Sequence, residues 1–237
     1  MSVNPAGVCV ETQTADEEQH WAASMLLTPV LEPCVRVWTC ARPAVVLGRA
    51  QRPDKYMALR AKADGIELCR RATGGGAVLA GPWLLGTSVI LPPGHRLVLP
   101  HIAESFRWVG QAHADWLNGL GINAKCVPSA QVHFDQSLAW ACFGNLSHWE
   151  VEADGGKIVG LSQARTRNGV LLSSAVLVGP PPWTLLCDVM GMRRGFVMML
   201  SQRTASCAQF LGKPPSTTVL AVSLLRALES ALGCSMQ

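Results

Sequence analysis

A strand that runs directly into three consecutive glycines is the feature that most constrains this chain. Residues 65–71 alternate in the manner of a β-strand, and Gly74, Gly75 and Gly76 follow after two further residues. Glycine has no side chain, so its backbone bends sharply and its N–H groups can approach an oxygen anion closely. Three glycines alone are equally compatible with a purely structural turn.

Two side chains beside the glycines favour a binding role. Alternate residues of a strand share a face, so we expect Arg71 and Thr73 to point into one cleft while Arg70 points away from it. A guanidinium can hold a carboxylate or a phosphate through two parallel hydrogen bonds, and a threonine adds a hydroxyl. The segment therefore predicts a site for a ligand that carries phosphate and carboxylate groups.

A second candidate segment is a hairpin that leads into a lysine. Residues 154–155 are Asp-Gly between two alternating segments, which is a hairpin signal, and Lys157 follows. A hairpin lysine is most often solvated. Here, however, Gly160 permits close backbone approach, Gln163 offers a donor and an acceptor, and Arg165 adds positive charge. We therefore expect Lys157 to deliver its ammonium group to the same anion site.

Cys142 is a candidate nucleophile. It lies between Ala141 and Phe143, and a cysteine among apolar neighbours is usually an inert core thiol. The alternative is a thiolate whose pKa is lowered by Lys157 or by a nearby arginine. The nine cysteines form no C-x-x-C pair and the histidines stand singly. We therefore predict no metal site, and free thiols in a reducing compartment, the cytoplasm.

Length and composition predict a single domain over residues 1–237. The chain is 49% hydrophobic and 15% charged, which is ample apolar material for one core. The net charge of +4 is spread over single basic residues, which argues against a nucleic-acid partner and favours a small acidic ligand. The sequence has neither an apolar run of about 20 residues nor a signal peptide, so we expect no membrane association.

Strand patterns and helix patterns alternate along the chain without an internal repeat. This alternation predicts the α/β class, with a sheet on which helices pack. We expect helices over residues 15–31, 54–63, 101–120, 196–210 and 219–232, and strands over residues 34–40, 44–47, 65–71, 78–79, 84–91, 122–127, 149–152, 157–159 and 169–178.

Three runs together resemble a known family. They are Pro43–Gln51, Arg70–Val78, and Gly156–Gln163 followed by Arg165. In this order they are similar to the catalytic domain of lipoate-protein ligases and of the wider biotin/lipoate ligase and octanoyltransferase superfamily. The resemblance covers about residues 15–235. It implies an α/β (α+β) fold in which a mixed, curved sheet is packed by helices.

The resemblance implies a ligase that uses ATP, with Mg²⁺, to activate lipoate or octanoate as an acyl-adenylate. In such ligases the lysine that matches Lys157 contacts the acyl carbonyl and the phosphate. A lysine of a carrier domain then attacks the mixed anhydride. The implied partners are lipoyl-carrier domains of 2-oxoacid dehydrogenases and the H protein of glycine cleavage. The implied binding residues are Arg71, Thr73, Gly74, Gly75, Gly76, Ala77, Gly160, Gln163 and Arg165.

A sister group, the octanoyltransferases, implies a different mechanism. Its members carry a Cys-Phe pair shortly before the lysine run, and Cys142-Phe143 is similar in place and spacing. In that group the cysteine holds the acyl group as a thioester, and neither ATP nor another cofactor is needed. The resemblance then implies that Cys142 is the nucleophile and that Lys157 holds the carbonyl oxygen.

The chain departs from the family pattern at two places. Family members usually carry histidine where this chain has Ala80, and His-Gly where it has Ser174-Ala175. Both changes remove polar groups from the expected cleft, so a degenerate relative that binds an acyl group without turnover is a third hypothesis. We also expect no C-terminal accessory domain of the kind that some ligases carry, and a separate partner protein could supply it.

Overall fold

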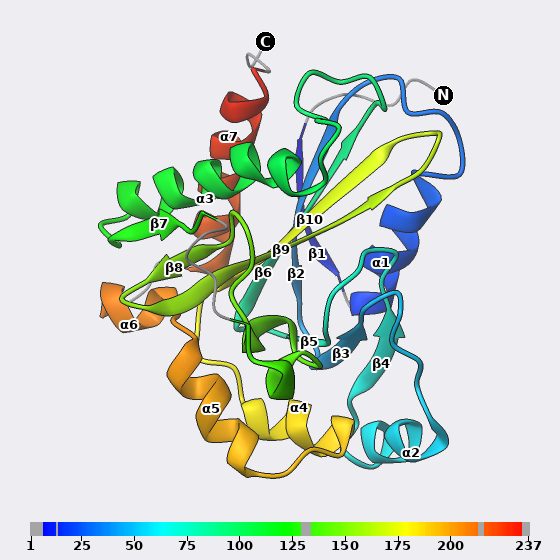
Figure 1. The fold of residues 1–237 in the computed structure, drawn as a ribbon, viewed down its shortest axis with the longest axis vertical. Helices are drawn as coiled ribbons and strands as arrows, with labels where there is room; N and C mark the ends of the chain where they lie inside the picture. Colours follow the sequence, from blue (N-terminus) through cyan, green and yellow to red (C-terminus); the bar gives the residue numbers. More distant parts are fainter. Residues whose placement is uncertain (1–6, 13, 129–133, 213–215, 234–237) are drawn as a thin grey trace.

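The computed structural model describes residues 7–12, 14–128, 134–212 and 216–233, and folds them into two sheets packed by helices (Figure 1). The larger sheet contains, in spatial order, β1 (Val8–Thr12), β2 (Cys34–Cys40), β6 (Leu84–Leu91), β10 (Val170–Leu177), β9 (Gly156–Arg165), β8 (Val151–Ala153) and β7 (Ala124–Cys126). The smaller sheet contains β4 (Glu67–Arg70), β3 (Ala44–Leu47) and β5 (Val78–Ala80). Parallel and antiparallel pairs occur in both sheets, so the predicted mixed α/β architecture is confirmed.

Seven α-helices surround the sheets in the described part of the chain. On one face of the larger sheet, α3 and α7 pack against each other and share its largest core. The other face packs against the smaller sheet and α4. The bounds are α1 (Ala15–Ser24), α2 (Lys55–Ala63), α3 (Arg107–Gly119), α4 (Trp183–Met190), α5 (Gly195–Arg203), α6 (Cys207–Leu211) and α7 (Thr217–Leu232), with 3₁₀ turns η1 (Ala103–Phe106), η3 (Gln136–Leu138) and η4 (Cys142–Gly144).

Side-chain caps fix where several helices begin. Thr14, Asp54 and Ser216 each accept a hydrogen bond from a backbone N–H in the first turn of α1, α2 and α7. Such caps satisfy N–H groups that have no partner inside the helix. The predicted starts of these three helices are therefore confirmed to within two residues.

Other predictions on secondary structure were wrong in part. The first helix ends at Ser24 rather than at residue 31, and the predicted helix 196–210 is broken between α5 and α6, where Thr204 bridges to Lys157. The expected single sheet is two sheets. Strand β1 and helix α4 were not predicted. β1 is a segment of only five residues that pairs in parallel with β2, so its strand character depends on a tertiary contact.

The predicted Asp-Gly hairpin is confirmed. Asp154 and Gly155 both have positive φ, at 51° and 77°, and connect β8 to β9. Two consecutive positive φ angles match the right-handed twist of the flanking strands. Within the described residues, we find no helix with the length and apolar character needed to cross a membrane. His133 and Cys234, which belong to the predictions on metal ligands and thiols, lie outside the described residues.

Candidate active site

A cavity lies between the two sheets, and about 460 Å³ without protein atoms, a volume that includes open solvent, lies in and before it. Beneath it, one row of paired residues crosses the larger sheet: Trp38 on β2, Gly86 on β6, Ala175 on β10 and Gly160 on β9. Small residues at three of these positions leave room above the central strands. The indole of Trp38 occupies the space over Gly86, where any side chain would collide with the ring. The lining also includes Val46, Val78, Leu84, Arg71 and Cys142.

The glycine bend and the cysteine segment meet at the edge of this cavity. The backbone N–H of Cys142 donates to the carbonyl of Ala77 over 2.9 Å, and Ala77 donates to Trp140 over 2.7 Å. A side chain at Gly76 would begin 2.7–2.8 Å from backbone atoms of residues 140–142, so only glycine fits there. The bend after β4 is therefore built directly against the backbone that carries the thiol.

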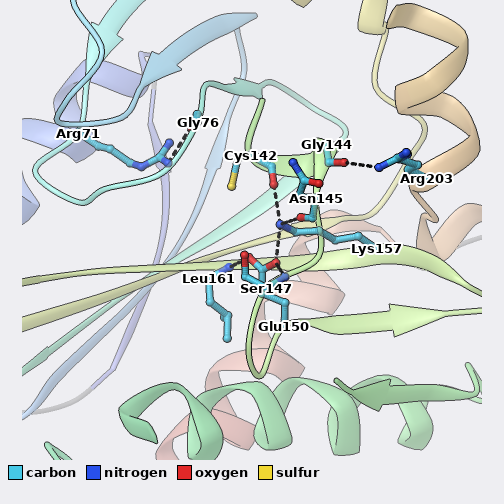
Figure 2. A network of polar contacts seen from close by, with 10 residues as sticks. All are labelled: Arg71, Gly76, Cys142, Gly144, Asn145, Ser147, Glu150, Lys157, Leu161 and Arg203. Atoms are coloured by element: carbon cyan, nitrogen blue, oxygen red, sulfur yellow. Dashed lines mark hydrogen bonds and ion pairs between the residues drawn. The ribbon is translucent and has the colours of Figure 1, made fainter. Parts of the chain in front are cut away.

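Lys157 is buried beside Cys142, and its amine has three partners (Figure 2). The amine donates to the carbonyl oxygens of Cys142 over 2.6 Å and Asn145 over 2.9 Å, and it pairs with Glu150 Oε2 at 2.6 Å. An ammonium group has three N–H donors, so all of them are used. In this structure Lys157 holds the cysteine segment in place rather than presenting a free ammonium to a ligand.

Glu150 is the counter-ion that the sequence reasoning missed. Its carboxylate accepts from the backbone N–H groups of Ser147 over 2.7 Å and Leu161 over 2.9 Å, in addition to its contact with Lys157. Both oxygens are thus occupied. The available signal was a pair of acidic residues at the start of the strand that precedes the hairpin. Glu152 is opposite Lys157 in the β8–β9 register but pairs with Lys125 near the surface.

The thiol of Cys142 and the amine of Lys157 are close neighbours. A side chain at Gly160 would begin 3.4 Å from the sulfur and 3.6 Å from the amine nitrogen. The glycine therefore keeps a narrow space open between these two groups. Figure 2 shows the sulfur on the side of Arg71 and Gly76, while the Cys142 carbonyl faces the amine. Cys142 is among the residues that line the cavity, which is where a thioester mechanism needs its thiol.

Arg71 lines the cavity and braces the glycine bend. Its guanidinium donates over 2.8 Å to the carbonyls of both Gly74 and Gly76, and more weakly to Val46. Gly75 between them has a φ of 95°, which favours glycine. Among the described residues no carboxylate pairs with Arg71, so its positive charge is uncompensated and acts on the cavity.

The remaining predicted residues lie further from the thiol. Thr73 accepts a hydrogen bond from Ser162 over 2.9 Å, which joins the glycine bend to β9. Gln163 donates to the carbonyl of Ile102 over 2.7 Å, and Arg165 donates to Ser105 over 2.9 Å. These last two side chains fasten the segment before α3, and the cavity lining contains neither of them.

The two departures from the family pattern have different surroundings. Ala80 is buried in the apolar core between the smaller sheet and α4. Ser174 is bonded to His113 Nε2 at 2.8 Å and to Thr87 at 2.6 Å. His113 Nδ1 lies 2.7 Å from the carbonyl of Val109, so Nδ1 carries the ring proton and donates it in a hydrogen bond to that carbonyl. Nε2 therefore accepts a hydrogen bond from the hydroxyl of Ser174. Burial lowers the pKa of His113 to about 4, so the ring is neutral.

Four other cysteine thiols are expected to be unreactive. Burial raises the pKa of Cys126 and Cys187 to about 11 and that of Cys207 to about 12, and it also raises the pKa of Cys69. These thiols are therefore protonated at neutral pH and are poor nucleophiles. The eight described cysteines are all free, as predicted. Among them, Cys142 is the one that lines the cavity between the sheets.

Comparison with known proteins places the site in context. Residues 18–228 match the model of the lipoyl protein ligase A/B catalytic domain. An octanoyltransferase LipM from Exiguobacterium sp. is 32% identical over 181 residues, which cover 74% of this chain and 62% of the relative. The chain thus spans less than two thirds of the length of that relative.

Two solved structures share the fold. One is a lipoate-protein ligase A bound with ATP, with a TM-score of 0.75 and 20% identity over 99% of this chain and 88% of the other. The second is from a study of a bi-partite lipoate protein ligase and its E2 lipoyl domain from Thermoplasma acidophilum, with a TM-score of 0.71 and 20% identity over 100% of this chain and 86% of the other. The fold implied by the sequence resemblance is therefore confirmed.

Proposed function

The chain belongs to the lipoyl protein ligase A/B catalytic domain family, and from this membership we propose that it is an acyltransferase that carries an octanoyl group as a thioester on Cys142. The acceptor is a lysine amine of a lipoyl-carrier domain. The observation that carries the proposal is the position of the Cys142 sulfur, which lines the cavity above Gly160 and close to Lys157. The octanoyltransferase relative supports the same choice.

The reaction has two balanced steps. The sulfur of Cys142 attacks the carbonyl carbon of an incoming octanoyl thioester, a new C–S bond forms, and the donor thiol leaves with the proton that Cys142 gives up. The amine of the carrier lysine then attacks the new thioester. An amide bond forms, and the Cys142 sulfur leaves and recovers a proton from the amine.

Each part of the cavity has a role in this scheme. The apolar walls contributed by Val46, Val78 and Leu84 take the hydrocarbon chain out of water. Lys157 fixes the backbone of residues 142–145, and exchange of one of its carbonyl partners for the acyl oxygen would place an ammonium against the developing negative charge. Arg71 lines the same cavity, and its uncompensated positive charge favours negative charge that develops there during the reaction.

The ATP-dependent ligase fits these residues less well. Magnesium prefers carboxylate and water oxygens, but the described residues that line this cavity include no Asp or Glu. Glu150, the carboxylate next to Lys157, has both oxygens occupied. The donor set thus supports a thioester route without ATP and Mg²⁺ over acyl-adenylate chemistry.

The partners follow from the acceptor chemistry. We propose lipoyl-carrier domains, such as those of 2-oxoacid dehydrogenases or the H protein of glycine cleavage, as acceptors. A separate accessory protein is a further proposal, supported by the fold shared with a bi-partite ligase. The single-domain organisation stays a prediction.

One experiment separates the three hypotheses. The protein is incubated with an octanoyl thioester of a carrier protein and without ATP, and intact mass spectrometry is used to look for an octanoyl adduct. We expect an adduct that is lost in Cys142→Ser, persists in Cys126→Ser, and passes to an unmodified lipoyl domain. Octanoyl-adenylate formed from ATP and octanoate without an adduct would select the ligase. A folded protein that forms neither product would be a binding relative.

A further inference from the structure

A groove outside the cavity is lined by residues of α2 and of the edge strand β4 of the smaller sheet. Figure 1 shows these two elements next to each other. The groove holds about 1180 Å³ of empty space. Its floor is apolar, with Leu47, Ile66 and Leu68 among the lining residues, and two cationic side chains, Lys62 and Arg70, complete it. An apolar floor edged by cationic side chains suits the surface of a protein partner.

The surface around the groove carries unpaired positive charge. Arg49, Arg52, Lys55, Lys62 and Arg70 are all exposed, and among the described residues none of their side chains has an ion pair or a hydrogen bond. The nearby acidic groups do not offset all of this charge.

Three acidic groups lie in these segments, Asp54, Asp64 and Glu67, and two of them have local roles. Asp54 caps the start of α2, and Glu67 accepts hydrogen bonds from the first residues of α1. A cluster of exposed cations without counter-ions is repulsive by itself, and it is relieved when an acidic surface covers it. The charge therefore selects an acidic partner.

Exposed apolar side chains lie on the same helix. Tyr56 is 59% exposed and Leu59 is 62% exposed, and the amine of Lys55 lies 5.0 Å from the Tyr56 ring centre. Aromatic and aliphatic side chains with basic residues around them are typical of the centre of a protein interface. The surface of α2 beside the groove therefore offers apolar area that a partner can bury, in addition to positive charge.

The groove lies on the face of the smaller sheet opposite the cavity, and the ends of β3 and β4 connect it to the glycine bend. Strands β3 and β4 are parallel, so both end on the same side, and their continuations are Gly48 and Arg71. Gly48 packs directly on Gly75, and the N–H of Arg49 donates to the carbonyl of Thr73 over 2.9 Å. A domain seated in the groove would thus lie beside the glycine bend, whose last residue, Gly76, contacts the Cys142 backbone.

We propose that this groove, together with the exposed Tyr56 and Leu59 of α2, docks the acidic carrier domain that presents the acceptor lysine. The inference rests on the proposed acyl transfer. We assign the groove to the acceptor domain rather than to the acyl donor, because an acceptor domain is needed whether the acyl group arrives as a thioester or as an adenylate. Docking there brings the lysine amine to the rim of the cavity, and the cations steer the encounter.

The test uses single-turnover transfer. Cys142 is first loaded with octanoate from octanoyl-CoA, and the second-order rate constant for transfer to an unmodified lipoyl domain is measured. We expect Arg70→Glu to lower that constant about tenfold at low salt, and Lys62→Glu/Arg70→Glu to lower it further. Arg226→Glu on α7 is the matched control, because it reverses one exposed arginine on another element. It should keep the rate constant of the unmodified protein within about twofold.

Two further measurements distinguish an effect on docking of the domain from an effect on the transfer step itself. Transfer to hydroxylamine, a small nucleophile that needs no docking, should be the same in all variants. Equal losses with hydroxylamine and with the domain would overturn the proposal, as would an unchanged rate in Lys62→Glu/Arg70→Glu. An effect confined to an acyl-carrier protein that donates the acyl group would also overturn it, because the occupant would then be the donor.

Failure of the proposed function would look different. If Cys142 never loads, binding of the unmodified lipoyl domain is measured by isothermal titration calorimetry instead. Binding that weakens in Lys62→Glu/Arg70→Glu, and not in Arg226→Glu, would support the docking surface even then. Binding that is equal in all these proteins, or absent from the unmodified protein, would overturn it.

Discussion

Lys157 and Glu150 form a buried ion pair 2.6 Å long, with each side chain 3% exposed. The pair ties β9 to the loop before β8, and through Lys157 it holds the carbonyls of Cys142 and Asn145. Two charges this far from water are stable only because each has further hydrogen-bond partners. The geometry of the thiol therefore depends on a carboxylate that does not face the cavity.

We predict that Glu150→Gln will lower the free energy of unfolding by about 3 kcal/mol, because it leaves a buried ammonium without its counter-charge. Urea denaturation measures the change. The control is the double variant Lys157→Met/Glu150→Gln, which removes both charges and should be more stable than Glu150→Gln alone. Additive losses in the double variant would show that the two side chains are not coupled.

Gly160 controls the space between the thiol and the amine. In Gly160→Ala the new methyl group would lie 3.3–3.6 Å from Lys157 and from the Cys142 sulfur. We expect loading of Cys142 to slow at least about tenfold, because an acyl carbonyl no longer reaches the sulfur in the required orientation. Intact mass spectrometry of samples quenched at successive times gives the loading rate of Cys142.

The matched control for this change is Gly179→Ala, because a methyl group there would have only ordinary contacts, beginning at 3.7 Å from Trp83. Its loading rate should equal that of the unmodified protein. Loading in Gly160→Ala that is as fast as in Gly179→Ala would argue against an acyl path between Cys142 and Lys157.

Local rules predicted most elements of the fold, but not where the chain depends on distant partners. The Asp-Gly hairpin and the helix caps follow from residues within a few positions, and they were confirmed. The split into two sheets was not predictable, because β2 and β3 both show ordinary strand patterns and only their tertiary partners differ. Strand β1 was missed for the same reason.

The same distinction applies to the site. The glycine run indicated residues 74–76, the Asp-Gly hairpin indicated Lys157, and the Cys-Phe pair of the family resemblance indicated Cys142. The structure brings these three segments together. The sequence alone does not show which groups each charged side chain binds. Lys157 faces carbonyls and Glu150, and Arg71 faces the carbonyls of its own bend, because buried donors take the nearest acceptors in the folded chain.

Arg71→Lys should loosen the glycine bend. A lysine amine cannot span the carbonyls of Gly74 and Gly76 as the planar guanidinium does. We expect amide hydrogen exchange over residues 74–77 to accelerate, and the loading rate of Cys142 to fall about tenfold as its backbone support weakens. Arg70→Lys is the control, since Arg70 is exposed and adjacent in sequence. If both variants exchange equally slowly, the bend does not depend on the guanidinium.

Glu18 on α1 makes stability depend on pH. Its side chain is fully buried, accepts a hydrogen bond from Ser88 over 2.9 Å, and lies 3.4 Å from Arg36. Burial raises the pKa of Glu18 from 4.5 to about 7, while Arg36 and Ser88 oppose this rise. Between these two values the folded protein keeps a proton that the unfolded chain releases. The contribution of Glu18 to stability is therefore complete below pH 4.5 and is lost as the pH rises through about 7.

We predict that Glu18→Gln, which stays neutral, will remove this dependence. His113, whose pKa is lowered to about 4, has the opposite slope below pH 6.5, so the difference between the two proteins is the quantity to measure. From about pH 6 to about pH 8, the unmodified protein should lose about 1 kcal/mol of unfolding free energy relative to Glu18→Gln. Parallel stability curves for the two proteins over this range would mean that Glu18 is ionised in the folded state throughout.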